Sequence, residues 1–263
     1  GHSFLIKKIV KRIKINFQNF LLKNITTEPS YYITPDKRSY VELKKKVPSF
    51  KIVKYNSSIF NQFKKIAYQE SRKKNIVFID QELEACFESK VTNNSQFMID
   101  KQKYWHCLNK IFECFEKKLK IKIIIAAHFR RSKDKKSLPN IGRKFVFDKT
   151  PELIKNSKLV IGHHSTALNY AILMRKPIVL LDFKVFDRIA LVNHKRVNFL
   201  RKEISPKIIH INNMYKFKFN KKTFKNLFKI NKKKYNNFKN YYVSFSNYKN
   251  VHKNIWSAIS SIK

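Results

Sequence analysis

The stretch from Asn156 to Phe183, NSKLVIGHHSTALNYAILMRKPIVLLDF, decides the fold. It holds two short apolar runs, 159–161 and 178–181, separated by a compact helical segment, 167–174, that the Lys-Pro pair at 176–177 stops. Uninterrupted apolar runs joined by a helix are typical of parallel strands buried on both faces. The stretch therefore predicts a strand–helix–strand crossover within a parallel sheet.

A polar group, Gly162 to Thr166, lies between the first run and the helix. Open α/β sheets bind ligands at the carboxyl ends of their strands, and the free N–H groups of a following helix favour an anion. The imidazoles of His163 and His164 and the hydroxyls of Ser165 and Thr166 would add donors, so the group predicts a phosphate-binding site. The residues leave an alternative open, in which a hydroxyl only caps the helix and a histidine is a satisfied core residue.

Two further strand exits carry polar side chains. The strongly apolar strand at 122–127 runs directly into His-Phe-Arg-Arg at 128–131, and arginine offers forked donors to phosphate. The strand at 75–80 ends at Asp80, which is a candidate ligand contact or base and, alternatively, a cap of the next turn. Because the carboxyl ends of parallel strands share one edge, we expect His128 and Ser165 to face the same crevice.

The remaining periodicity predicts a doubly wound α/β domain. With three glycines in the chain, neither a Rossmann GxGxxG motif nor a P-loop is present. Around the stretches already described, the patterns predict strands within 31–34, 50–55, 145–147 and 207–211, a turn at Pro35-Asp36, and helices at 58–70, 100–118, from 150, at 185–201 and within 220–262.

The net charge of +41 over 263 residues has three interpretations. These are nucleic-acid binding, attachment to an anionic membrane surface, and a general Lys/Asn/Ile bias. The charge is spread along the whole chain, and no zinc-finger, RNA-recognition or helix-turn-helix pattern is present. The pattern favours a membrane surface combined with composition bias over nucleic acid.

The segment Phe4 to Leu22 interleaves apolar and basic residues on a helical period. It predicts a basic amphipathic helix that lies on an anionic membrane interface; the alternative is an ordinary surface helix packed on its own domain. No uncharged apolar window of about 18 residues exists, so no transmembrane helix is predicted, and no secretory signal is visible. The opening Gly-His-Ser, without an initiator Met, is typical of a vector-derived start and predicts that the natural protein extends upstream. The three cysteines form no CxxC pair, which predicts a reducing compartment and no structural zinc.

Three stretches carry a family resemblance: IVFIDQ (76–81), IIIAAHFRRS (123–132) and residues 142–183, which end with the stretch quoted first. Together they resemble the nucleotide-binding half of GT-B glycosyltransferases, and more closely the bacterial surface-polysaccharide transferases of the sialyltransferase and Kdo-transferase type. Those families share a His-Pro motif at one strand exit and a Ser-Ser or Ser-Thr motif at the start of a later helix. His128 matches the first motif, with Phe129 in place of Pro, and Ser165-Thr166 matches the second.

The resemblance implies a GT-B-like fold, in which a doubly wound parallel-sheet nucleotide-binding domain follows a smaller, truncated N-terminal part. Its expected divisions are residues 4–70, a partial acceptor-side region with the basic helix; 71–215, the nucleotide-sugar-binding α/β domain; and 216–263, C-terminal helices. The family's acidic base motif, Asp-Asp/Glu-Gly, is not found in the chain. Two alternatives stay open: a base upstream of Ser3 in a longer protein, or, within this chain, Asp80 or Asp36.

The same resemblance implies a metal-independent glycosyltransferase that needs no cofactor. It would transfer a sugar, an acid sugar such as sialic acid or Kdo first, from a CMP- or other nucleotide-activated donor to a glycan or glycolipid acceptor of a bacterial capsule or lipopolysaccharide. We expect a cytoplasmic enzyme, peripheral at the inner membrane, that binds no nucleic acid. The alternatives are a nucleotide-sugar epimerase or polyol-phosphate transferase on a similar fold, or a basic nucleic-acid-binding module. The candidate catalytic residues are His128 and Asp80, and the candidate nucleotide- or phosphate-binding residues are Arg130, Arg131, Gly162, His163, His164, Ser165, Thr166 and Glu152.

Overall fold

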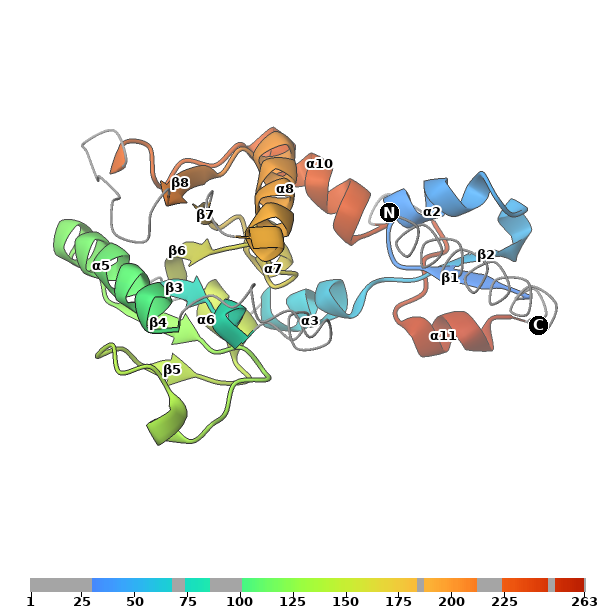
Figure 1. The fold of residues 1–263 in the computed structure, drawn as a ribbon. Coiled ribbons are helices and arrows are strands. Elements are labelled where there is room, and N and C mark those ends of the chain that lie inside the picture. Colours follow the sequence, from blue (N-terminus) through green and yellow to red (C-terminus); the bar gives the residue numbers. More distant parts are fainter. Residues whose placement is uncertain are drawn as a thin grey trace, which may run out of the picture.

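The structure, a computed structural model, describes residues 30–67, 74–85, 101–183, 187–211, 224–245 and 249–262. Its main feature is a six-stranded sheet in which every pair of neighbouring strands is parallel (Figure 1). The strands, in the order β5-β4-β3-β6-β7-β8, are β5 (Phe145–Val146), β4 (Ile123–Ala126), β3 (Asn75–Ile79), β6 (Ser157–Gly162), β7 (Ile178–Phe183) and β8 (Lys207–Ile211).

This order means that the chain builds the sheet outward twice from its centre. It runs from β3 through β4 to β5 on one side, and then crosses back to β6 and continues through β7 to β8 on the other. The point at which the direction reverses, between β3 and β6, is where open sheets of this kind place their ligands. The predicted parallel α/β sheet is confirmed, and β3 stands between β4 and β6.

Helices cover both faces of the sheet, because its strands are apolar on both sides. On one face, α5 (Lys101–Leu119) buries Tyr104, Leu108, Phe112 and Phe115, which recur at helical spacing, against β3, β4, β6, β7 and β8. On the other face lie α6 (Thr150–Lys155), α7 (Leu168–Leu173), α8 (Asp187–Ile204) and α10 (Lys232–Phe238). The predicted doubly wound arrangement is thereby confirmed.

A smaller part joins both ends of the described chain. It contains a parallel pair, β1 (Tyr32–Thr34) and β2 (Ile52–Lys54), with α2 (Lys37–Lys44) and the C-terminal α11 (Ile255–Ser260). Tyr55, just after β2, pairs with His252 in a parallel bridge. Figure 1 shows this part at the end of the molecule opposite β5 and α5, with α3 (Ser58–Ala67) and α10 between them.

The structure refines the predictions at both ends of the described chain. Asp36 lies not in a free turn but at the N-cap of α2, where its carboxylate accepts hydrogen bonds from the Ser39 amide (2.8 Å) and hydroxyl (3.0 Å). This role removes Asp36 as a candidate base. The described C-terminal residues hold α10, a π-helix at Lys239–Val243 and α11, all within the predicted range 220–262.

Some predictions fall on residues that the structure does not describe. The Phe4–Leu22 helix lies outside the described residues, as do both predicted domain boundaries, near 70 and 215. These remain predictions. Among the helices that are described, none combines the length and the apolar composition needed to cross a bilayer.

Candidate functional site at the carboxyl edge of the sheet

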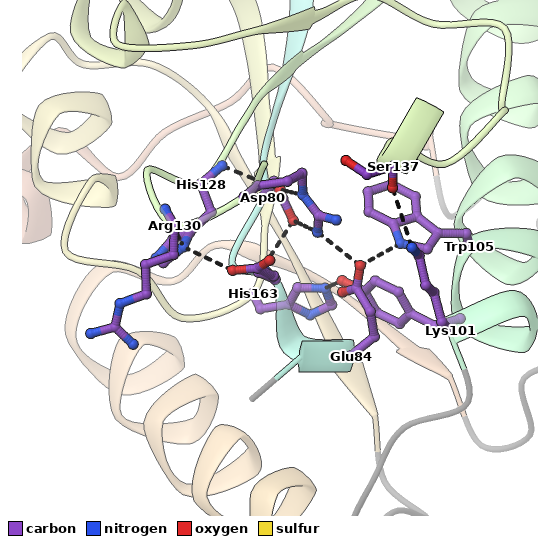
Figure 2. A network of polar contacts seen from close by, with 11 residues as sticks. Asp80, Glu84, Lys101, Trp105, His128, Arg130, Ser137 and His163 are labelled. Atoms are coloured by element: carbon purple, nitrogen blue, oxygen red, sulfur yellow. Dashed lines mark hydrogen bonds and ion pairs between the residues drawn. The ribbon is translucent and has the colours of Figure 1, made fainter. Parts of the chain in front are cut away.

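A buried carboxylate organises the carboxyl edge of the sheet. Asp80, the residue that follows β3, is 2% exposed. Its Oδ1 accepts hydrogen bonds from the Glu82 amide (2.9 Å) and Arg131 Nη2 (3.0 Å), and its Oδ2 accepts from Arg131 Nε (2.6 Å) and the His128 amide (3.2 Å). The side chain therefore ties the exit of β4 to the exit of β3 (Figure 2).

Arg131 is held on its other side by a second carboxylate. Its Nη2 donates to Glu84 Oε1 at 2.8 Å, and Trp105 Nε1 donates to the same oxygen at 2.7 Å. The guanidinium carbon also lies 5.2 Å from the centre of the Trp105 ring. Burial opposes the charge of Arg131, but its hydrogen bonds and the charges of Asp80 and Glu84 outweigh burial and raise its pKa.

These contacts correct two of the sequence assignments. Both oxygens of Asp80 are occupied by donors from the protein, so the structure places this carboxylate as an anchor and not as a base facing a substrate. The guanidinium of Arg131 donates its hydrogen bonds to Asp80 and Glu84, and the residue is 6% exposed. It therefore does not point toward a bound phosphate. The local reason is burial: a charge removed from water must be paired.

Residues 128–130 lie between these anchors; Phe129 and Arg130 are exposed and His128 is half-buried. His128 Nδ1 accepts from the Arg130 amide at 3.4 Å and lies 3.6 Å from Glu82 Oε2. Because Nδ1 faces the main chain and Glu82, Nε2 is the ring nitrogen left to meet a ligand. Phe129 is 71% exposed, and the Arg130 guanidinium lies 5.2 Å from the centre of its ring.

His163, by contrast, is a core residue. It is fully buried after β6; its Nδ1 lies 3.0 Å from the Leu181 carbonyl oxygen and its Nε2 lies 3.0 Å from the Tyr104 hydroxyl. The carbonyl can only accept, so Nδ1 carries the proton and Nε2 accepts from Tyr104. Burial lowers the pKa of His163 to about 4, against smaller opposing contributions from the Leu181 carbonyl and from Asp80 and Asp182. His163 therefore does not reach a ligand; the satisfied-core alternative applies to it.

The buried imidazole predicts a stability loss in mild acid. His163 stays neutral in the folded protein down to about pH 4, whereas in the unfolded chain it takes up a proton below about pH 6.5. The unfolded state therefore binds more protons in that window, and stability falls as the pH drops from 6.5 to 4, by about 3 kcal/mol at most. Urea unfolding at pH 7 and pH 4.5 measures this. His163→Leu should reduce the difference in unfolding free energy between the two pH values, whereas His106→Ala, at an exposed position, should preserve it. An equal difference in the parent and in His163→Leu would contradict the assignment.

The loop after His163 lies next to the β3 exit. Gln81 Nε2 donates to the His164 carbonyl, so residues 80 and 81 hold both the 128–131 loop and the 164–166 loop. His164 is half-buried, and its pKa is lowered by burial and by the nearby charge of Arg196. Ser165 is half-buried and Thr166 is exposed.

The structure shifts the start of the following helix. The Leu168 amide donates to the Ser165 carbonyl (3.1 Å) and the Asn169 amide to the Thr166 carbonyl (3.0 Å), which are tighter turns than those of an α-helix. The α-helix begins only at Leu168, one residue after the start of the predicted helical segment, so Ser165 and Thr166 precede it. Ser165 Oγ accepts from the Ala167 amide at 3.2 Å, which is a cap-like contact within this turn.

Two other assigned residues lie elsewhere. Gly162 is buried as the last residue of β6, in register with Ile79 and Leu180. Glu152 lies in the first turn of α6, and its buried Oε2 has no hydrogen-bond partner within the described part of the chain. The pKa of Tyr170, on α7, is raised first by burial and second by the negative charge of Glu152. Glu152 therefore lies near α7.

A second polar cluster occupies the same edge at β7 and β8, and the sequence did not predict it. Asp182 is fully buried, with His194 Nδ1 3.0 Å from each carboxylate oxygen and His210 Nδ1 2.9 Å from Oδ2. Asn198 Nδ2 lies 2.9 Å from His194 Nε2. An aspartate near the end of a buried strand is the signal that could have located this cluster.

A cavity of about 670 Å³ lies at the other edge of the sheet. Ser157 and Pro177, at the amino ends of β6 and β7, line it together with Leu119, Ile121, Lys158, Met174, Arg175, Lys176 and Phe228. Ligands of open α/β sheets bind at the carboxyl ends of the strands. We therefore place the candidate site at the Asp80 edge and not in this cavity.

The sequence also missed the partners that fix the site. The buried network is completed by Gln81, Glu84, Tyr104 and Trp105. The signal that could have pointed to it is the group Glu82, Glu84 and Glu88 in an otherwise basic chain. Buried Gln81 Oε1 and Glu84 Oε2 have no hydrogen-bond partner among the described residues. They are acceptors beside the anchor that a bound hydroxyl could use.

No protein-family model matches the chain, and no curated protein sequence matches it. Among solved structures, a variant of the wall teichoic acid polymerase TagF is 13% identical to this chain. The match covers 59% of this chain and 40% of the TagF chain, with a TM-score of 0.34. The Methanocaldococcus jannaschii UDP-GlcNAc 2-epimerase, in complex with UDP-GlcNAc and UDP, is 15% identical, with coverages of 80% and 59% and a TM-score of 0.41. The glycotransferase of kitacinnamycin is 8% identical, with coverages of 72% and 44% and a TM-score of 0.32. The chain thus spans 40% to 59% of these proteins, and at such TM-scores the likenesses define no family.

Proposed function

We propose that this chain contains the nucleotide-binding part of a GT-B-type glycosyltransferase. The observation that carries the proposal is the joint anchoring of two loops to the exit of β3: Asp80 holds the 128–131 loop and Gln81 holds the 164–166 loop. Both loops lie at the carboxyl edge, beside the reversal point between β3 and β6, where a doubly wound sheet binds a nucleotide.

The half-buried and exposed side chains at this edge suit a phosphate. His128 would donate through Nε2, Arg130 would supply a forked cation, and Ser165 and Thr166 would supply hydroxyls. In a sugar transfer, negative charge grows on the nucleotide phosphate as the glycosidic bond breaks, and preorganised donors stabilise that charge. Of the sequence's candidate residues, these four form the proposed site, together with the main chain of His164.

The finer assignments rest on the family resemblance. We propose that the donor is a nucleotide sugar, with a CMP-activated acid sugar preferred over UDP-sugars. The proposed acceptor is a glycan or glycolipid of a bacterial capsule or lipopolysaccharide. An acidic donor or a polyanionic acceptor suits a chain with a net charge of +41. The same charge supports a cytoplasmic enzyme that is peripheral at the inner membrane.

Replacing Ser165 and Thr166 together by Ala should weaken nucleotide binding at least tenfold, because hydrogen bonds to a charged phosphate contribute about 1.5–3 kcal/mol each. The matched control is Ser132→Ala, an exposed serine on the β4–β5 loop. Isothermal titration and thermal unfolding on the same samples separate the two roles of the hydroxyls. A double variant that melts earlier yet binds nucleotide normally would show that they only cap the turn.

The proposal as a whole is tested by titrating the chain with CMP, UDP and a short single-stranded oligonucleotide. Saturable binding of CMP, weakened by His128 or Ser165 substitution, supports the transferase. UDP binding accompanied by epimerisation of a UDP-sugar would instead support the epimerase alternative. Tight, salt-dependent binding of the oligonucleotide alone would contradict the proposal and favour a nucleic-acid-binding module.

A further inference from the structure

The C-terminal helix α11 exposes an apolar face. Ile255, Trp256 and Ile259 are 43%, 75% and 43% exposed, and at 100° per residue they fall within one arc of about 100°. Ala258 lies outside this arc, about 60° from Ile255, and is fully buried. A capping box between Asn254 and Ser257 fixes the start of the helix, so the orientation of this face is defined.

Positive charge surrounds this face. Lys249 and Lys253 precede the helix and are exposed, and no aspartate or glutamate occurs in the sequence after Glu203. The rest of the smaller part, residues 30–57, holds seven Lys or Arg against two acidic residues, one of which is the Asp36 cap. An exposed tryptophan and two isoleucines in a strongly cationic setting have the composition of a surface that enters a lipid headgroup region.

We propose that the face formed by Ile255, Trp256 and Ile259 docks onto an anionic lipid bilayer. The three side chains enter the boundary between headgroups and acyl chains, and Lys249 and Lys253 contact the anionic headgroups. Figure 1 shows α11 at the end of the molecule opposite α5 and β5. The inference specifies a surface for the membrane association proposed above, on which it rests, and is independent of the transfer chemistry.

The two tryptophans of the chain make the test direct. Trp105 is 3% exposed and Trp256 is 75% exposed, so only Trp256 should respond to lipid. With vesicles of phosphatidylcholine containing phosphatidylglycerol, we expect the emission to shift to shorter wavelength and brominated lipids to quench it. Neutral phosphatidylcholine vesicles should produce neither effect, and high salt should reverse both. Unchanged emission with anionic vesicles would overturn the proposal.

Matched variants separate the reporter from the contact. Trp256→Phe should keep vesicle binding but lose the emission shift, whereas Trp256→Ser with Ile259→Ser should lower partitioning into anionic vesicles by about tenfold or more. Phe228→Ser, an exposed aromatic residue outside α11, should bind as the parent does. Equal vesicle binding by the parent and the double variant would leave membrane association standing and overturn this surface. Tryptophan emission that is already at short wavelength without lipid would instead identify residues 1–29 as the occupant of this face. Emission that shifts with protein concentration would identify a second copy of the chain.

Discussion

Arg131→Met is expected to destabilise the protein by about 3–5 kcal/mol, because it leaves the buried carboxylates of Asp80 and Glu84 without their shared cation. Methionine keeps much of the apolar contact with Trp105, so the loss reports chiefly on charge and hydrogen bonding. The free energy of unfolding from urea titration at pH 7 measures it. A loss below about 1 kcal/mol would mean that the two carboxylates find other compensation.

The adjacent arginine provides the matched control. Arg130 is exposed, and its guanidinium lies over the exposed Phe129 ring. Arg130→Met should change stability by no more than about 0.5 kcal/mol, as is usual for surface substitutions. In the proposed site it should weaken nucleotide binding, so the two neighbouring arginines are expected to separate stability from binding.

His128→Ala is expected to lower the rate of sugar transfer by about 10²–10⁴-fold, which is the usual loss when a positioned proton donor is removed. Nucleotide affinity should fall by less than tenfold, because charge on the leaving phosphate peaks in the transition state. The measurement is release of nucleotide from the donor that the titration identifies, with nucleotide affinity measured in parallel.

The substitution spares the fold, which makes the result interpretable. His128 contacts Asp80 through its backbone amide, a bond that alanine retains. His106→Ala, at an exposed position on α5, is the matched histidine control and should leave both rate and affinity unchanged. Equal losses in rate and affinity for His128→Ala would show that the imidazole binds ground state and transition state alike.

The sheet was predictable because its signal is local. The runs that form β3, β4, β6 and β7 are continuously apolar, and a strand buried on both faces needs such a run. The order of the strands in the sheet was less predictable, because no local sequence pattern indicates that β3 lies between β4 and β6. The same limit applies to the site: the sequence located the strand exits but not which side chains turn inward.

The inward residues depend on partners far along the chain. Asp80 and Arg131 meet across 51 positions, and His163 and Tyr104 across 59. Arg130 and Arg131 look alike in sequence, yet one is exposed and the other is 6% exposed. In the pair His163-His164, one ring is fully buried and its neighbour is half-buried. Both pairs lie in turns or bends that follow a strand, so the two-residue alternation of a strand does not tell which neighbour turns inward.

The bridge between Tyr55 and His252 has a consequence for the order of folding during synthesis. All six strands of the larger sheet are available once residue 211 has left the ribosome, so that sheet can form while the C-terminus is still being made. The smaller part must wait. The Ser57 hydroxyl donates to the Val243 carbonyl. The Asn56 amide donates to the His252 carbonyl, and the His252 amide donates to the Lys54 carbonyl. These contacts close loops of nearly two hundred residues. The first segment of the described chain to be synthesised is thus among the last to reach its native contacts.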